Sequence, residues 1–501
     1  MTCGLKSEAA SSPAAPERPA APICAPFRVR AAPAARAGEE AADCSEEKRP
    51  RCKEAEMDFP TEAKGWLESD IAEIASRPEE CAARPGADFT RERKLPLSRL
   101  LLLLVTMGTG SVRHELMEHF RYDPGSLPTS SAFCQQRAKL LPSALRRLLR
   151  AFASRLGLRE YRDGWALVAV DGSSFCFGPD RSDPATFHEN REGARGHNDV
   201  HAVALYDMVG GAYVDAVVQN GREKDEFRAM CELVDDWPGW AREALRAIFV
   251  GDRGFASYNV FAHVAEAGLH FAIRAKDLNV RRMLKPGGDV ALPDEMDVTV
   301  RLVLSRTTAR TKVAHPERIA DYRRIDTAAF DFLTEESPEY EVELRIVRFP
   351  VGDGFENVVT NLPAQGFGAE EVKAIYGMRW GIETSFRRLK LNIGAVELHS
   401  RKAAWVMQEV LARLVLYDFC AAVAAYVSRL PDVAGKRGRE HAHKVNFADC
   451  CRVCCAFLRG RARGPDVEEL VAGSTSPVRP GRKFHRRHRL RSPSGYAYRP
   501  A

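Results

Sequence analysis

The stretch ALVAVDGSS, residues 166–174, decides the fold, because an unbroken apolar run is followed at once by an aspartate, a glycine and two serines. An apolar run of this length is typical of a strand that is buried on both faces. An aspartate after such a strand points into the crevice at the carboxyl edge of the sheet, where α/β folds bind ligands. The stretch therefore predicts a core strand with Asp171 at the functional edge of a sheet.

A second stretch, AIFVGDRG at residues 247–254, has the same pattern, with Asp252 directly after the apolar run. Two aspartates at the ends of neighbouring strands would repel each other unless a cation lay between them. Hard carboxylate oxygens favour Mg²⁺ or Mn²⁺. Asp-Gly pairs are also common in ordinary turns, so either aspartate alone admits a purely structural interpretation. Their shared context favours a metal site.

The residues around these two stretches predict the rest of a mixed sheet. A hairpin and a helix should precede the second strand, and a helix and a further strand should follow it. Three strands, helix, strand, helix and strand is the order of a ribonuclease-H-like sheet. The ranges are 201–206 and 212–218 for the hairpin, 224–234 and 258–267 for the helices, and 270–274 for the last strand.

Composition and periodicity divide the whole chain. We predict the α/β fold class: a ribonuclease-H-like mixed sheet interrupted by a β-rich insertion, with an all-helical N-terminal domain and a helical C-terminal region. The first segment has hardly any aromatics and is typical of a disordered chain. The predicted boundaries are 1–57 for this disordered segment, 58–157 for the helical domain, 158–276 and 363–430 for the two parts of the core, 277–362 for the insertion, and 431–501 for the C-terminal helices and basic tail.

The N-terminal helices offer a candidate DNA reader. Apolar residues recur at three- and four-residue steps in 95–107, 112–120, 132–140 and 144–156, with glycine and proline breakers between them. Short helices joined by tight turns are compatible with a helix-turn-helix motif. Residues 130–139, with the polar side chains Gln135, Gln136, Arg137 and Lys139, would be its recognition helix. A plain helical packing domain is the alternative.

The third acidic position comes from YGMRWGIETSFRRLK, residues 376–390. Its Tyr376, Arg379, Glu383 and Lys390 follow each other by three, four and seven residues, so one helix would stack them along one face. A carboxylate among cationic and phenolic donors suits a metal ion bound beside phosphates. A solvated helix face with ordinary charge pairs is the alternative that periodicity leaves open.

These four residues match the Tyr-x2-Arg-x3-Glu-x6-Lys signature of the DDE transposases of bacterial insertion sequences. The chain resembles the branch of that family that has a β-strand insertion before the catalytic glutamate. The resemblance extends to Asp171 in Val-Asp-Gly-Ser and to Asp252 in Asp-Arg-Gly-Phe, and it covers roughly residues 90–501.

The resemblance implies a cut-and-paste DNA transposase that cleaves transposon ends and transfers the strands into target DNA. Asp171, Asp252 and Glu383 would be catalytic and would coordinate two Mg²⁺ or Mn²⁺ ions, which lie roughly 3.5–4 Å apart in sites of this type. Members of the branch cut through a hairpin with a flipped base stacked on an aromatic ring. The insertion has no tryptophan, so that step stays open here, with Phe349 and Phe355 as possible substitutes.

The resemblance also implies partners and a place in the cell. Tyr376, Arg379 and Lys390 would contact DNA phosphates, with Arg253 as a further contact. The partners would be double-stranded DNA, as terminal inverted repeats and target, and a second copy of the chain in a synaptic homodimer. We expect a cytoplasmic, nucleoid-associated bacterial protein with no membrane partner. The alternatives are a catalytically silent, domesticated DNA-binding derivative, a repair or junction nuclease, and a helix-turn-helix regulator.

Charge and cysteine content agree with an intracellular DNA-binding protein. The net charge of +6 is modest, but the tail from Arg479 onward carries eight arginines and lysines and no acidic residue. Such a tail suits a polyanion, although a solvated disordered end has the same composition. The odd number of 13 cysteines favours reduced thiols over a disulfide scaffold. Four of them are either the buried face of a helix or part of a zinc site with His441 and His443: Cys450, Cys451, Cys454 and Cys455.

Overall fold

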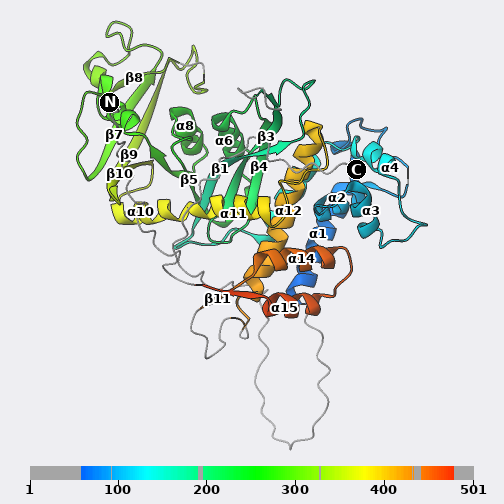
Figure 1. Ribbon diagram of the computed structural model, residues 1–501. Coiled ribbons are helices and arrows are strands. Elements are labelled where there is room, and N and C mark those ends of the chain that lie inside the picture. The colour runs from blue at the N-terminus through cyan, green and yellow to red at the C-terminus, as the bar shows by residue number, and fades with distance from the viewer. Residues whose placement is uncertain are drawn as a thin grey trace, which may run out of the picture.

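The apolar run of residues 166–170 lies at the centre of a ten-stranded mixed sheet (Figure 1). The computed structural model describes residues 58–91, 93–189, 196–326, 329–430, 433 and 442–478. In it, β1 (Trp165–Phe177) pairs antiparallel with β3 (His197–Asp207) and parallel with β5 (Arg246–Gly251). The sheet has a β-branched and aliphatic interior because both of its faces are covered by helices.

The remaining core strands complete the predicted topology. β4 (Tyr213–Asn220) forms the hairpin with β3, and β6 (His270–Ala275) pairs parallel with β5. The order β4-β3-β1-β5-β6, with three antiparallel strands followed by two parallel ones, is ribonuclease-H-like, as predicted. A two-residue strand, β2 (Phe187–His188), adds to the end of β3.

One expectation about β1 is wrong. Asp171 does not follow the strand but lies inside it, because β1 stays paired with β3 as far as Phe177. The parallel pairing with β5 does stop at Val170 and Gly251, one residue earlier. Asp171 therefore lies where β1 loses one neighbour and keeps the other. Gly-Ser-Ser has turn composition, and only the long partner strand holds it extended.

The β-rich insertion extends the same sheet. Its strands are β7 (Met296–Ser305), β9 (Glu339–Val351) and β10 (Gly354–Thr360), with β8 (Tyr322–Arg324) at the outer edge, so the segment is β-rich as predicted. β10 pairs antiparallel with β6, so the insertion continues the core sheet outward. A helix that the sequence did not predict, α9 (Asp277–Leu284), precedes these strands.

Helices cover both faces of the sheet. α6 (Glu226–Asp235), α7 (Gly239–Ala244) and α8 (Tyr258–Glu266) pack on the face that contains Val168 and Val170. The opposite face, which contains Ala169 and Phe175, is covered by the helices that follow the insertion. Figure 1 shows two of them running end to end across the sheet: α10 (Ala369–Met378) and α11 (Trp380–Leu391). The sequence predicted one helix here, but the structure divides it at Arg379.

The N-terminal and C-terminal helices surround α12 (Ala403–Val427) and share one apolar core with it (Figure 1). By length and composition α12 could cross a membrane, but most of its apolar window is buried inside the protein. The surrounding helices are α1 (Phe59–Ser76), α2 (Leu97–Thr106), α3 (Val112–His119), α4 (Ser130–Arg137), α5 (Ser143–Leu156), α14 (Phe447–Leu458) and α15 (Gly464–Gly473), joined by the small sheet of β11 (His443–Val445) and β12 (Thr475–Pro477).

The proposed recognition helix is present as α4, but two of its four polar side chains point inward. Gln136 and Arg137 are buried, and Arg137 forms an ion pair with Glu409 of α12 at 2.9 Å and donates to Gln408 at the same distance. These two residues hold α4 to the core and cannot enter a DNA groove, so the prediction is wrong for them. The segment 1–57 and the basic tail from residue 479 lie outside the described residues.

Candidate active site

The three predicted acidic residues come from three different elements. Side chains alternate along a strand, so Asp171 points to the same face of the sheet as Ser173. Ser173 accepts a hydrogen bond from Lys390 of α11 at 2.8 Å, which places Asp171 on the α11 face. Asp252 follows β5, and its Oδ1 accepts the backbone N–H of Gly254 at 2.7 Å. Glu383 lies in the first turn of α11.

Arg379 lies between two of these carboxylates. Its Nη2 contacts Glu383 Oε1 at 2.8 Å, and its Nη1 is 4.0 Å from Asp171 Oδ2. The guanidinium is buried and also lies near the rings of Tyr376 and Trp380, with centroids 5.8 and 5.4 Å away. The division of the helix at Arg379 thus sets a cation between an acid of the sheet and an acid of the helix.

Asp171 is held in an unfavourable electrostatic environment. The pKa of Asp171 is raised to about 6, chiefly by burial and also by the neighbouring Asp252 and Glu383, against the opposing effects of Arg379 and the Gly172 N–H. Burial would lower the pKa of Arg379, but Tyr376, Glu383 and Asp171 outweigh it, and the net shift is upward. The charge of Asp171 is therefore coupled to both other acids, and Arg379 opposes their effect while burial keeps the net shift upward.

The donor set suits a hard divalent cation, since it consists of carboxylate oxygens only. The side chains are nevertheless spread around Arg379 and not gathered. Within the described ranges, no three His, Cys, Asp or Glu side chains are close enough together to hold one metal ion. The chemistry of the donors thus fits Mg²⁺ or Mn²⁺, and the guanidinium stands where positive charge is needed.

The residues predicted to contact DNA have different environments. Lys390 lies over the Phe175 ring at 5.0 Å in addition to its bond to Ser173. Arg253 is exposed beside Asp252. Tyr376 is buried, and burial raises the pKa of its hydroxyl, which also interacts with Arg274. The structure brings Arg379 and Lys390 along the Asp171 face of β1, while Tyr376 packs into the core beneath them.

Sequence reasoning missed a pair of residues on the other side of β1. His201 of β3 and Glu226 at the start of α6 are 2.8 Å apart, measured from Nε2 to Oε1. His201 is the first cause that lowers the pKa of Glu226. In the sequence, Asp225-Glu226 has the appearance of an ordinary acidic helix start, which the N-cap bond from Arg228 N–H to Asp225 bears out. The only signal was the glycine after Asp171, whose missing side chain makes room for both.

The other predicted features are structural in character. Phe349 is buried, whereas Phe355 is exposed and Arg348 lies 4.9 Å from its ring centroid. Cys450, Cys451 and Cys454 form the buried face of α14, as the amphipathic interpretation predicted. Zinc binding by these thiols stays untested, and His441 lies outside the described residues.

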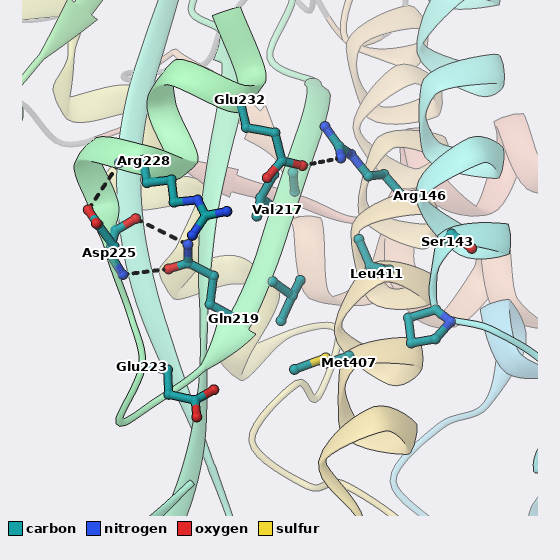
Figure 2. Close-up of a pocket in the computed structure, with 13 residues that line it drawn as sticks. Ser143, Arg146, Val217, Gln219, Glu223, Asp225, Arg228, Glu232, Met407 and Leu411 are labelled. Atoms are coloured by element: carbon teal, nitrogen blue, oxygen red, sulfur yellow. Dashed lines mark hydrogen bonds and ion pairs between the residues drawn. The ribbon is translucent and has the colours of Figure 1, made fainter. Parts of the chain in front are cut away.

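One cavity of the described residues lies apart from Asp171, Asp252 and Glu383. It has a volume of about 510 Å³ and is lined by side chains of α5, β4, α6 and α12 (Figure 2). Figure 2 shows Arg146 of α5 paired with Glu232 of α6 across it, at 2.6 Å. The cavity lies between α5 and α12 on one side and β4 and α6 on the other, and Asp171, Asp252 and Glu383 are not among its lining residues.

The sequence of the chain is similar to a known protein family. No curated protein matches the chain. Among solved structures, it is similar to the piggyBac transposase in a synaptic complex with hairpin DNA, at 12% identity and a TM-score of 0.39, over 87% of this chain and 88% of that one. The family profile of the transposase DDE domain matches residues 166–419, from the first core strand to α12. This match spans just over half of the sequence, and the chain belongs to the transposase DDE domain family.

Proposed function

We propose that the protein is a cut-and-paste DNA transposase in which Asp171, Asp252 and Glu383 bind two divalent ions, Mg²⁺ or Mn²⁺. The observation that carries this proposal is the position of Arg379 between Asp171 and Glu383, at 4.0 and 2.8 Å. Acids from a core strand and from a distant helix share one cation there. Burial and, after it, the charges of Asp252 and Glu383 raise the pKa of Asp171, so a bound cation would stabilise its charged form.

When bound, the ions would activate the attacking oxygen and stabilise the leaving oxygen of a phosphodiester. The chain's own residues would bind the DNA and balance the charge of the acids. Arg379 would offset the charge of the acids and reach a DNA phosphate, since a guanidinium fork suits phosphate oxygens. Lys390 would hold the strand beside Ser173, and the exposed Arg253 would add a contact at the rim. Tyr376 would support Arg379 from below by packing against its guanidinium.

The finer assignment rests on the Tyr-Arg-Glu-Lys spacing. We place the protein in the bacterial insertion-sequence branch, acting on terminal inverted repeats and target DNA as a homodimer in the cytoplasm, at the nucleoid. Synapsis requires two ends held together, which favours two copies of the chain. The N-terminal helices remain our candidate for end recognition, with the exposed Gln135 as the remaining outward polar side chain within α4.

The test uses the full-length protein and DNA cloned from the two flanks of its gene. With Mg²⁺ we expect nicking at the repeat ends and joining of the released 3′ ends to target DNA. The variants D171N, D252N and E383Q should abolish both nicking and joining. E73Q changes an exposed helix residue about 100 residues before Asp171 and should retain both activities. Specific binding of the ends without cleavage would identify the silent derivative. Cleavage without joining would identify a nuclease. Either result overturns the proposal.

A further inference from the structure

The strand that carries Asp171 is supported from behind by a contact between a histidine and a glutamate. Gly172 and Ser174 face the side of β1 opposite to Asp171, because side chains alternate along a strand. On that side His201, which pairs with Ser174 across the β1–β3 ladder, contacts the Ser174 hydroxyl through Nδ1 at 3.0 Å. Its Nε2 contacts Glu226 Oε1 at 2.8 Å. The pair thus lies directly behind the residue that follows Asp171.

Gly172 leaves the space that this pair fills. A Cβ on Gly172 would lie 2.5 Å from His201 Nε2 and 2.6 Å from Glu226 Oε1. Both distances are far below van der Waals contact, so no other residue fits without displacing the pair. His201 is only 4% exposed, which leaves its ring little freedom to move aside. The glycine is therefore explained by the close approach of an imidazole and a carboxylate.

The second oxygen of Glu226 reaches the segment that carries Asp252. A Cβ on Gly254 would be 3.6 Å from Glu226 Oε2 and 2.8 Å from Asp252 Oδ1. The Gly254 N–H also donates to Asp252 Oδ1. One carboxylate therefore lies against both glycines that neighbour the two predicted metal-binding aspartates, Oε1 at Gly172 and Oε2 at Gly254.

Glu226 is fixed at this position by the start of α6. Its neighbour Asp225 caps the helix by accepting the Arg228 N–H at 3.0 Å. Gln219 of β4 accepts the Asp225 N–H at 2.9 Å and donates to the Asp225 carbonyl at 3.1 Å (Figure 2). The first turn of α6 is thereby tied to the sheet, and the Glu226 side chain is aimed between β1 and the end of β5.

We infer that Glu226, oriented by His201, is a positioning residue for the metal site, a fourth carboxylate that sets the spacing of Asp171 and Asp252 and adds negative charge behind them. The inference rests on the proposed function, since it presupposes that these aspartates bind metal. Outer-layer partners that orient ligands typically change metal affinity by about 10–100-fold when removed. E226Q, which keeps the shape and removes the charge, should weaken metal binding within this range.

The experiment measures Mn²⁺ binding to the full-length protein by isothermal titration calorimetry and by the loss of the free-Mn²⁺ electron paramagnetic resonance signal. E223Q is the matched control. Glu223 is an exposed acid three residues earlier, and its carboxylate accepts a hydrogen bond from Asn220 of the same loop. We expect E226Q to bind Mn²⁺ about 10–100-fold more weakly than E223Q and the natural protein. The rate of end nicking at saturating Mn²⁺ should stay within a few-fold of the natural one.

E226D and H201Q complete the test. E226D keeps the carboxylate but moves it back by one methylene group, so its Mn²⁺ affinity should lie between those of E226Q and the natural protein. It replaces E226Q in the test if E226Q does not fold. H201Q removes the residue that orients Glu226, so its Mn²⁺ affinity should also fall. Natural Mn²⁺ affinity in E226Q or E226D, with D252N losing it, would overturn this inference and leave the proposed function intact. Failure of the natural protein to bind Mn²⁺, or full binding by D252N, would overturn both.

Discussion

Replacing Asp171 by asparagine should make the metal-free protein more stable at neutral pH. The folded protein raises the pKa of Asp171 from 3.8 to about 6, chiefly by burial. The folded state therefore holds the proton more tightly than the unfolded chain does, and deprotonation at higher pH favours unfolding. A shift of roughly two pKa units, at about 1.4 kcal/mol each, corresponds to about 3 kcal/mol at pH 8. D171N removes this penalty.

The pH dependence distinguishes this effect from a simple change in packing. Above pH 6 the difference between D171N and the natural protein should be constant, at about 3 kcal/mol in favour of D171N. It should shrink as the pH falls from 6 toward 3.8, because the natural Asp171 then becomes protonated and neutral as well. Below the ordinary pKa of aspartate no difference should remain.

The assay is urea unfolding in EDTA, followed by circular dichroism between pH 4 and pH 8, with free energies compared at each pH. Adding Mg²⁺ should reverse the order, since a cation that binds only the folded natural protein stabilises it by mass action. Equal stability of the two proteins at pH 8, or a difference that does not change with pH, would refute the electrostatic account of the site.

Three further variants test other parts of the argument. Burial would raise the pKa of Glu409, but Arg137 and His399 lower it to about 2. E409Q should therefore lower the free energy of unfolding at pH 7 by about 3 kcal/mol or more. In urea unfolding this difference should fade as the pH falls from 4.5 to 2. G172A should lower the melting temperature and the Mn²⁺ affinity together, because its Cβ displaces Glu226; unchanged Mn²⁺ affinity by calorimetry would contradict this. R379Q removes a cation that competes with metal, so we expect tighter Mn²⁺ binding. Cleavage of transposon ends in a gel assay should nevertheless be at least tenfold slower. A loss of both Mn²⁺ binding and cleavage would refute the competition.

The sequence predicted the elements whose pattern is local. The buried runs at 166–170 and 247–250 and the hairpin of β3 and β4 followed from apolar periodicity. Periodicity could not show how far pairing continues. Gly172 has turn character, and only the β3 partner keeps β1 extended past Asp171. Strand ends depend on a partner strand from elsewhere in the chain, which no local pattern contains.

Side-chain direction was predicted less well than element type. Gln136 and Arg137 look like solvent-facing polar residues of a short helix, yet both are buried, Gln136 donating to the Leu95 carbonyl and Arg137 to Gln408 of α12. The ion-pair partner of Arg137, Glu409, lies more than 270 residues further on, inside a long and mainly apolar helix. A charge that faces inward is recognisable only once its counter-charge is in place. For the same reason the pair of Glu226 and His201 could not be found from the sequence.

The arrangement of charge explains why the acids and Arg379 occur together. A single buried acid such as Asp171 would cost stability, and a second and third acid nearby raise that cost. Arg379 offsets part of it at a position where a metal ion would offset more, because a divalent ion carries twice the charge of a guanidinium. On the proposed function, the protein folds with Arg379 alone and the same site would favour a divalent cation. Removing the acids should improve stability and abolish catalysis, whereas removing Arg379 should improve metal binding and impair catalysis. If the carboxylates were only surface charges, these substitutions would change neither stability nor metal binding in opposite directions. Measuring both therefore distinguishes an active site from a chance spacing of acidic residues.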